Sequence, residues 1–358
     1  MKAYLILEDG HVFEGVSFGA EKEVISEFVF NTSMTGYTEI LTDPSYAGQS
    51  VVMTYPLIGN YGVSYKDQEA AHPFVEGFVV HELSRLGSNF RMNMNLNDYM
   101  IENNIPGIQG VDTRAITKII RQHGCMNGMI TTQKYNLDEV LDKIKAFKVE
   151  GVVQRCTCDA PYKLGKGDFH VALYDFGAKR NIAKELVKRG CEVTVVPAST
   201  PASEIINGNY DGIMLSNGPG DPAENVEIVQ EIKELAASGM PIFAICLGHQ
   251  LMALAHDFKT EKLKFGHHGA NHPVRDAHTG RVYISTQNHN YVIKEDSIDP
   301  EVAKVWFTNV NDGTIEGMEY INENIRTVQF HPEASAGPHD TAYLFDEFIK
   351  MMGGHKNA

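Results

Sequence analysis

The spacing of apolar and polar positions differs between the two halves of the chain. In the first half, short apolar or alternating runs lie between clusters of Gly, Pro, Asn and Asp, a pattern typical of strands joined by turns. The predicted strands are residues 4–7, 12–14, 27–30, 50–54 and 76–80. Helical periodicity marks residues 97–103, 113–123 and 137–147. Asp112 and Gly124 are placed to cap the second helix. Residues 1–150 are therefore predicted to form a β-rich α+β domain.

The pattern of apolar and polar positions changes after residue 150. Residues 151–168 hold several turn residues and no sustained period, which predicts an inter-domain linker. From residue 169 onward, strands and helices alternate. The predicted strands are 170–175, 191–196, 212–215 and 241–245, and the predicted helices are 179–189, a short one opening at Pro201, 223–237 and 247–256. This alternation predicts an α/β domain over residues 169–358, with a mostly parallel, doubly wound sheet that binds ligands at the carboxyl ends of its strands.

One strand-to-helix junction has the sequence of a nucleophile elbow. In Pro241–Gln250 (PIFAICLGHQ) a buried strand stops at Cys246 and a helix starts at once. The small residues Ala244 and Gly248 let such a turn close, and the helix N-terminus favours a reactive thiolate. The alternative is an ordinary core cysteine, because cysteine is among the most buried residue types. The strand-turn-helix setting favours the nucleophile.

A cysteine nucleophile needs a base, and His331 in the segment TVQFHPEAS is the candidate. Pro332 biases His331 toward extended geometry, in which positions i and i+2 point the same way. Glu333 is therefore predicted to hold the imidazole tautomer and to stabilise the imidazolium. Alone, a His-x-Glu pair is usually a pair of surface residues. With the elbow it predicts a Cys-His-Glu triad.

A Gly-rich and Pro-rich loop follows the strand that ends at Leu215. Its sequence is SNGPGDP, and its rigid backbone would expose amides at the strand's carboxyl end. The N–H of Gly220 is predicted to donate to an oxyanion, and the first free amides of the helix after Cys246 can donate as well. The alternative is a plain strand-to-helix turn, which this composition also suits.

Composition narrows the class of partner. The chain has 358 residues, with 46 acidic against 31 basic ones and a formal charge of −15. Phosphate binding needs Lys and Arg, so nucleic acid is not the expected partner. The five cysteines are an odd number in a long chain, which favours reduced thiols over a disulfide framework. The N-terminus lacks a signal-peptide pattern, and the apolar stretch 240–247 is too short to span a bilayer. We expect a cytoplasmic protein without a membrane partner.

Two further patterns of His and Cys residues bear on metal or redox chemistry. His267, His268 and His272 lie close together, with His256 and His278 nearby, but their spacing fits no standard ligand pattern. Cys156-x-Cys158 has the wrong spacing for a zinc knuckle or a thioredoxin-like site. No metal is therefore expected.

Longer segments resemble a known family. The elbow, the GPGDP loop and the HPE segment resemble the class I (triad) glutamine amidotransferases. Sequence strings spread over nearly the whole chain resemble the small-chain family of carbamoyl-phosphate synthetase. These strings are FNTSMTGYTEILTDPSYAGQ (30–49), YPLIGNYG (55–62), YDFGAKRNI (174–182), FGHHGANHPV (265–274) and HPEASAGPHD (331–340).

The resemblance implies a role for each matching position. Cys246 would attack the amide carbon of glutamine, His331 would protonate the departing ammonia, and Glu333 would orient His331. Leu247 and Gly220 would supply the amides of the oxyanion hole. Residues implied in glutamine binding are Ser45, Gly218, Gly220, Leu247, Gln250, Asn288, Asn290 and Tyr291.

Two departures from the family pattern are visible. Ala244 stands where Gly is frequent, and Asn290-Tyr291 stand where Gly-Phe is usual. Asn tolerates a left-handed backbone next best after Gly, and Tyr keeps the aromatic face.

The resemblance also implies a partner. Carbamoyl phosphate synthesis consumes ATP, and the phosphate-binding pattern Gly-x-x-x-x-Gly-Lys-Ser/Thr is absent. ATP and Mg are therefore expected on a large synthetase chain, with this chain as the glutaminase of a heterodimer or a higher assembly and no cofactor of its own. The ammonia would serve arginine and pyrimidine biosynthesis. The alternatives are another triad amidotransferase subunit and a non-catalytic docking protein on the same fold.

Overall fold

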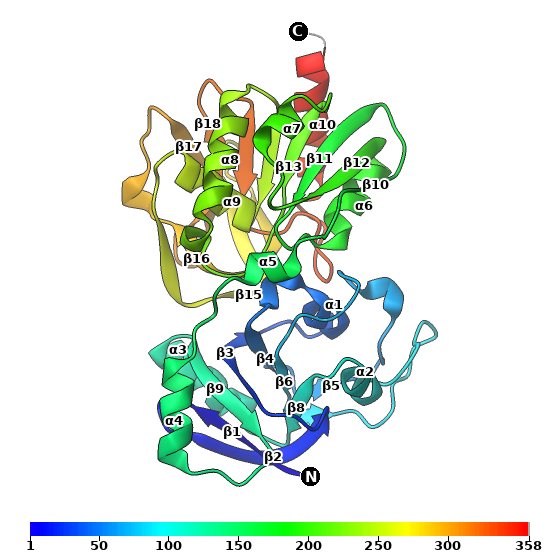
Figure 1. Cartoon of the computed structure of the whole chain (residues 1–358), viewed down its shortest axis with the longest axis vertical. Coiled ribbons are helices and arrows are strands. Elements are labelled where there is room, and N and C mark those ends of the chain that lie inside the picture. Colours follow the sequence, from blue (N-terminus) through cyan, green and yellow to red (C-terminus); the bar gives the residue numbers. More distant parts are fainter. Residues whose placement is uncertain (357–358) are drawn as a thin grey trace. The chain divides into compact units, whose positions relative to one another are not determined.

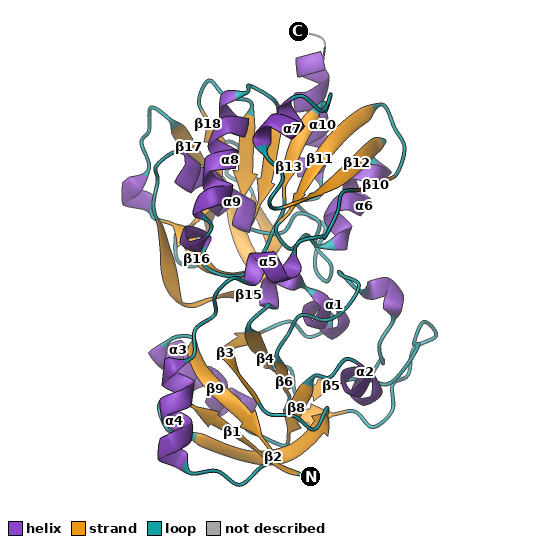
Figure 2. Ribbon diagram, in the orientation of Figure 1, coloured by secondary structure: helices purple, strands orange, loops and turns teal. Residues whose placement is uncertain are grey.

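The computed structural model describes residues 1–356 and separates into two units (Figures 1 and 2). The first unit comprises residues 1–150 and 264–269, and the second comprises 151–263 and the chain from 270 onward. The segment 151–168, predicted as a linker, contains a short helix, α5 (Val152–Cys156), and a strand, β10 (Tyr162–Leu164), and it groups with the second unit.

A closed barrel of seven strands forms the first unit, in the order β1-β2-β8-β6-β4-β3-β9. Its strands are β1 (Lys2–Leu7), β2 (Val12–Gly19), β3 (Val24–Asn31), β4 (Gln49–Met53), β6 (Gly77–Val79), β8 (Pro106–Gln109) and β9 (Met126–Thr131). Helices α1 (Tyr37–Thr42), α2 (Leu96–Glu102), α3 (Thr113–His123) and α4 (Leu137–Ala146) accompany it, with β5 (Leu57–Ile58) paired to β7 (Glu82–Leu83). Closure leaves the barrel without the unpaired edge strands of an open sheet.

Strand periodicity builds the core of the barrel. Along β1, Leu5 and Leu7 enter one buried cluster, whereas Ile6 between them joins another with Val140 and Ile144 of α4. Successive side chains of a strand point to opposite faces, so one strand serves both clusters. The predicted caps of α3 are confirmed, because the Asp112 carboxylate accepts the N–H of Ala115 at 2.9 Å and Gly124 follows the last helical residue.

Two strands that complete the barrel, β8 and β9, were absent from the sequence prediction. Both contain glycine, which the sequence pattern equates with turns. A Cβ on Gly107 of β8 would lie 2.6 Å from the Phe18 ring, and one on Gly128 of β9 would lie 2.9 Å from the Ile6 carbonyl oxygen. Glycine in a strand interior often marks such a close approach.

A ten-stranded sheet forms the second unit, in the order β10-β12-β11-β13-β14-β19-β18-β17-β15-β16. Its remaining strands are β11 (Phe169–Asp175), β12 (Cys191–Pro197), β13 (Gly212–Leu215), β14 (Ile242–Ile245), β15 (Thr260–Asp276), β16 (Val282–Ile293), β17 (Ala303–Asn309), β18 (Ile315–Tyr320) and β19 (Ile325–Val328). The central strands β12, β11, β13, β14 and β19 are parallel, and the flanking pairs β10–β12, β19–β18, β18–β17 and β17–β15 are antiparallel.

Helices cover both faces of this sheet (Figure 2). They are α6 (Arg180–Lys188), α7 (Ala202–Ile206), α8 (Val226–Ala237), α9 (Leu247–Ala255) and α10 (Tyr343–Lys356). On β11, Val171 and Leu173 pack in a core with α6 and α10, while Ala172 and Tyr174 pack in a core with α7, α8 and α9. The predicted α/β fold with a doubly wound sheet is confirmed.

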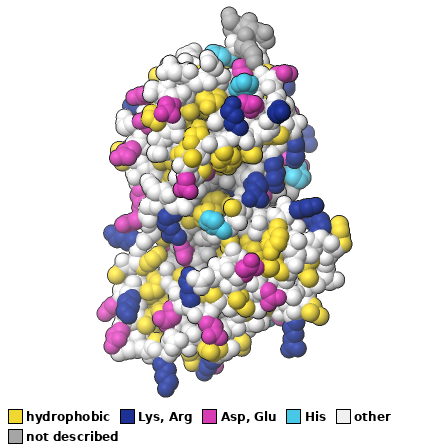
Figure 3. All heavy atoms as spheres, turned by 45° about the vertical axis from the view of Figure 1, so that its right-hand side comes forward, with side chains coloured by type: hydrophobic (Ala, Val, Ile, Leu, Met, Phe, Trp, Pro, Cys, Tyr) yellow, Lys and Arg dark blue, Asp and Glu magenta, His cyan; other side chains and the backbone are white. Residues whose placement is uncertain are grey.

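The surface carries both signs of charge. On the face drawn in Figure 3, Lys and Arg side chains occur together with Asp and Glu. Within residues 1–356, no helix combines the length and the apolar character needed to cross a membrane.

Candidate active site

The predicted catalytic residues follow parallel strands that are neighbours in the sheet. Cys246 follows β14 and His331 lies three residues beyond the end of β19, which pairs with β14. On the other side, β13 leads into the loop with Gly220, and β11 leads to Lys179. Ligand sites of open α/β sheets lie at these carboxyl ends. The candidate active site is thus assembled at one edge of the sheet.

Cys246 occupies a left-handed backbone conformation, with φ +53° and ψ −104°. Its N–H donates to the Val328 carbonyl at 2.8 Å, and its own carbonyl accepts the N–H of Gln250 at 3.2 Å. A non-glycine residue with positive φ is strained by about 1–3 kcal/mol, and such strain clusters at functional sites. The thiol is 2% exposed and lies 3.8 Å from the Asn288 carbonyl oxygen. These contacts hold Cys246 at a strained turn.

Gly248 lets the helix after Cys246 approach β13. Its N–H donates to the Ser216 carbonyl at 3.0 Å, and a Cβ at this position would lie 2.7 Å from the Leu215 carbonyl oxygen. Alanine favours a helix by about 1 kcal/mol over glycine, but the clash with backbone costs about 1–3 kcal/mol. We therefore expect Gly248→Ala to lower the free energy of unfolding, as measured by urea denaturation.

Gly354→Ala is the matched control for that substitution, because a Cβ on Gly354 in α10 meets no atom within 4 Å. Its stability should stay equal to the parent's or rise. Equal stability of the Gly248 and Gly354 variants would contradict the close approach of helix and strand.

His331 and Glu333 form a buried pair. The His331 Nδ1 lies 2.7 Å from Glu333 Oε1, and both side chains are fully buried. A hydrogen bond from Nδ1–H to the carboxylate leaves Nε2 as the basic nitrogen. Among residues 1–356, no hydrogen bond involves His331 Nε2. That tautomer is the one that a general base requires.

The predicted reason for this contact was wrong, although the contact itself is present. The Ala334 N–H donates to the His331 carbonyl at 3.2 Å, so the segment from His331 to Ala334 is a turn rather than extended chain. A bridge from His331 to Thr286 of β16 fixes the start of the turn. The turn, not strand alternation, brings Glu333 back to the imidazole.

Lys179, which the sequence analysis did not single out, is the second partner of Glu333. Its Nζ lies 3.0 Å from Glu333 Oε1 and donates to the Ala334 carbonyl at 2.7 Å, and its side chain is 2% exposed. Burial by itself would raise the pKa of Glu333, but the charges of Lys179 and His331 outweigh it and lower that pKa to about 2. Glu333 is therefore ionised at neutral pH.

The backbone of the GPGDP loop suits the predicted oxyanion site. Gly220 has φ +88°, which favours glycine, and a Cβ on Gly218 would lie 2.4 Å from the Phe176 carbonyl oxygen. Leu247 is the first residue of α9. Within the described residues, the N–H groups of Gly220 and Leu247 donate to no backbone carbonyl. Two amides are thus available to an oxyanion.

Most of the residues implied in glutamine binding lie in the second unit, which also contains Cys246. Gln250 follows Cys246 by one turn of α9, and its Nε2 donates to the Tyr291 carbonyl at 2.7 Å. Asn288 and Asn290 are buried in β16, while the Tyr291 ring lies 5.9 Å from the Lys262 ammonium. Ser45 belongs to the first unit, where its N–H donates to Asp43 at 3.0 Å.

The interpretation of Asn290 needs correction. The sequence analysis related it to tolerance of a left-handed backbone. Asn290 instead lies inside β16 and is not among the described residues with positive φ. Extended chain accepts any side chain, so asparagine meets no backbone restriction here. In β16, Asn288 and Asn290 share a face, and Tyr291 points to the other.

His249 is a further buried group, in the helix that follows Cys246, and the sequence analysis missed it. Its Nδ1 lies 2.7 Å from the Thr327 hydroxyl of β19, so it ties the helix after Cys246 to the strand before His331. Burial lowers the pKa of His249 to about 3, which keeps it neutral. Its place in the motif CLGHQ was the available signal.

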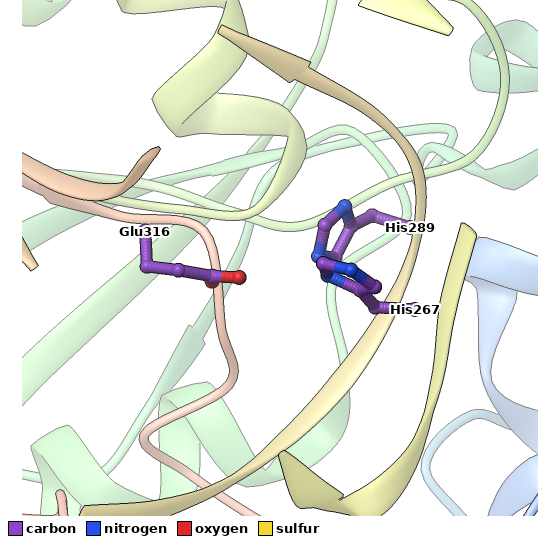
Figure 4. Close-up of side chains that lie close together, drawn as sticks. All are labelled: His267, His289 and Glu316. Atoms are coloured by element: carbon purple, nitrogen blue, oxygen red, sulfur yellow. The ribbon is translucent and has the colours of Figure 1, made fainter. Parts of the chain in front are cut away.

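Figure 4 shows another group of ionisable side chains, with the Glu316 carboxylate turned toward His289. The ring nitrogens of His289 lie 2.9 Å from the Tyr291 carbonyl oxygen and 3.1 Å from Gln287 Oε1. Both nitrogens that could bind a cation are thus engaged within β16. His267, the third residue labelled, belongs to the segment 264–269 that groups with the first unit.

The fold and the site define a class of protein. A doubly wound sheet carries a cysteine elbow and a buried His-Glu pair, and residues 172–351 match the model of the family "Glutamine amidotransferase class-I". The second unit is a class I glutamine amidotransferase domain. Residues 5–130 match the "Carbamoyl-phosphate synthase small chain, CPSase domain". The chain belongs to the family of carbamoyl phosphate synthase small chains.

Similar proteins span the whole chain. The carbamoyl phosphate synthase small chain of Clostridium perfringens is 49% identical over 350 residues, which are 98% of this chain and 99% of the relative. That of Bacillus cereus is 47% identical and covers 99% of this chain and 97% of the relative. The chloroplastic small chain of Oryza sativa is 47% identical, and the match covers 99% of this chain and 83% of the relative. Similarity over the N-terminal domain separates the chain from other class I glutamine amidotransferases.

Proposed function

We propose that this chain is a glutaminase subunit, in which Cys246, His331 and Glu333 hydrolyse L-glutamine to glutamate and ammonia for a large synthetase chain. The observation that carries the proposal is the strained Cys246 at the end of β14, beside the strand that leads to the buried His331–Glu333 pair. Family membership supplies the substrate class and the partner.

The first half of the reaction forms a thioester. His331 Nε2 takes the proton of the Cys246 thiol, and the thiolate attacks the side-chain amide carbon of glutamine. The amide oxygen becomes an oxyanion, which the N–H groups of Leu247 and Gly220 stabilise. The imidazolium then gives its proton to the departing nitrogen, so the C–N bond breaks and ammonia leaves. A γ-glutamyl thioester remains on Cys246.

The second half hydrolyses that thioester. A water molecule gives a proton to His331 Nε2 and attacks the thioester carbon. The C–S bond breaks, the sulfur recovers the proton, and glutamate leaves. Glu333 stays ionised throughout, because Lys179 and His331 hold its pKa at about 2. An ionised Glu333 stabilises the imidazolium in both halves without taking the proton itself.

Ammonia released into water at neutral pH becomes mostly ammonium and is no longer a nucleophile. A protected channel to the large chain follows from this chemistry, and so does a tight interface with it. The large chain would use ATP, Mg and bicarbonate to make carbamoyl phosphate for arginine and pyrimidine biosynthesis. The cytoplasm is the proposed compartment.

The test is glutamate release from glutamine by the purified chain, with and without a co-expressed large chain. Slow release alone and a large increase with the partner are expected, because a coupled site should turn over only when its ammonia can be used. Fast release that ignores the partner would contradict a coupled subunit and point to a free-standing glutaminase.

A glutamine-analogue electrophile separates catalysis from mere docking in the same preparation. The proposed mechanism expects the reagent to alkylate Cys246 and to abolish glutamate release, with mass spectrometry locating the adduct. A chain that binds the large partner but leaves Cys246 unlabelled and releases no glutamate would instead be a docking protein.

A further inference from the structure

The side-chain amide of Gln250 has only one chemically consistent orientation. Its Nε2 lies 2.7 Å from the Tyr291 carbonyl oxygen, which can only accept a hydrogen bond, so the atom facing it must be the nitrogen. The second hydrogen of that nitrogen goes to Gln329 Oε1 at 2.9 Å. The assignment of oxygen and nitrogen, which is often ambiguous for an amide, follows here from the acceptors.

This orientation decides what Gln250 offers to a ligand. Both N–H groups are used inside the protein, and among residues 1–356 no hydrogen bond involves Gln250 Oε1. Gln250 lies one turn after Cys246, on the same face of α9. Its oxygen is therefore the side-chain atom left to accept a hydrogen bond from a ligand bound beside Cys246. An acceptor suits the α-ammonium of an amino acid and repels its α-carboxylate.

The side-chain amide of Gln329 is only half satisfied by hydrogen bonds in its buried position. Its side chain is 0% exposed, its Oε1 accepts from Gln250, and its Nε2 donates to no acceptor within the described chain. A buried donor without a partner destabilises a fold, so an apolar side chain of similar size would serve stability better. Stability therefore does not explain a glutamine at position 329.

We propose that Gln329 is a positioning residue that fixes the amide of Gln250 with its oxygen toward the α-ammonium of the bound amino acid. It acts through Gln250 and touches neither the thiol nor the reacting amide. This inference rests on the proposed glutaminase function. Gln329 lies two residues before His331, so the positioning residue and the proposed base belong to the same segment of the chain.

The test measures glutamine KM and kcat for glutamate release by the full chain with its large partner. Gln329→Met should raise KM about tenfold with kcat within about threefold, because uniform substrate binding is lost. The urea midpoint should stay equal to the parent's or rise, and the rate at which iodoacetamide alkylates Cys246 should not change. Gln329→Leu is the second apolar variant, and Gln329→Glu, which keeps an accepting oxygen, should restore KM toward the parent's.

A double-mutant cycle distinguishes positioning from general damage. Gln250→Met alone should raise KM, and adding Gln329→Met should raise it no further, since the second residue acts through the first. Gln68→Met is the matched control: Gln68 is a buried glutamine of the first unit whose Nε2 donates to the Tyr99 hydroxyl, and its loss should leave KM unchanged.

An unchanged KM in Gln329→Met, or a further tenfold rise on the Gln250→Met background, would overturn the positioning role while leaving the glutaminase intact. Absence of Cys246-dependent glutamate release from the parent chain would overturn the proposed function, and this inference with it.

Discussion

Replacing Cys246 by serine should abolish glutamine use while leaving synthesis from free ammonia intact. The hydroxyl is a far weaker nucleophile than the thiol that His331 is proposed to activate, so glutamate release should fall by at least about 10³-fold. Free ammonia bypasses this step and reaches the large chain directly. The measurement is glutamate release and carbamoyl phosphate formation by the complex, with glutamine or ammonium as the nitrogen source.

The substitution changes a single side-chain atom, so a control at another buried cysteine separates the loss of chemistry from an effect on folding. Cys191→Ser is the matched control, because Cys191 is a fully buried cysteine of β12 in the same sheet, away from the triad. Its glutaminase activity per folded molecule should equal the parent's. His331→Asn should behave like Cys246→Ser, since residues that act as a unit lose the same function. Persistent glutaminase activity in either triad variant would refute the assignment.

The elements that sequence reasoning found are those whose pattern is local. The strands β11, β13 and β14 are short apolar runs between turn residues, and both faces of each are buried, as expected for a sheet covered by helices. The strands β8 and β9 escaped because Gly107 and Gly128 imitate turns in the sequence. Gly107 is required because it packs against Phe18, about 90 positions earlier in the chain, and Gly128 because it packs against the Ile6 carbonyl, about 120 positions earlier.

The same division holds in the active site. Cys246 could be predicted because a nucleophile elbow is written in ten consecutive residues. Lys179 could not, because its contact with Glu333 spans more than 150 positions and depends on the order of β11, β13, β14 and β19 in the sheet. Strand order is decided by packing across the whole domain, and no local pattern records it.

Lys179→Met should cause the largest loss of stability among the substitutions considered. Removing one partner of a buried ion pair leaves the other charge uncompensated, which destabilises by about 3–5 kcal/mol. Among residues 1–356, Glu333 would keep only His331 as a partner for its buried carboxylate. Glutamate release should fall as well, because a displaced or protonated Glu333 no longer orients the base. Urea unfolding at neutral pH measures the first effect. Lys184→Met is the control, because Lys184 is exposed and lies in α6, the helix that follows Lys179 directly.

The pH dependence of stability gives the sharper form of this prediction. The pKa of Glu333 is lowered from 4.5 to about 2 in the folded chain, so its ionised form stabilises the fold above about pH 4.5 and this contribution is lost as the pH falls toward 2. For a shift of this size the contribution is about 3 kcal/mol. Without Lys179 the pKa of Glu333 in the folded chain rises toward its ordinary value, so the part of the unfolding free energy that is lost in acid becomes smaller. The difference in unfolding free energy between parent and Lys179→Met should therefore narrow from neutral pH to pH 2. A constant difference across that range would show that Lys179 does not control the ionisation of Glu333.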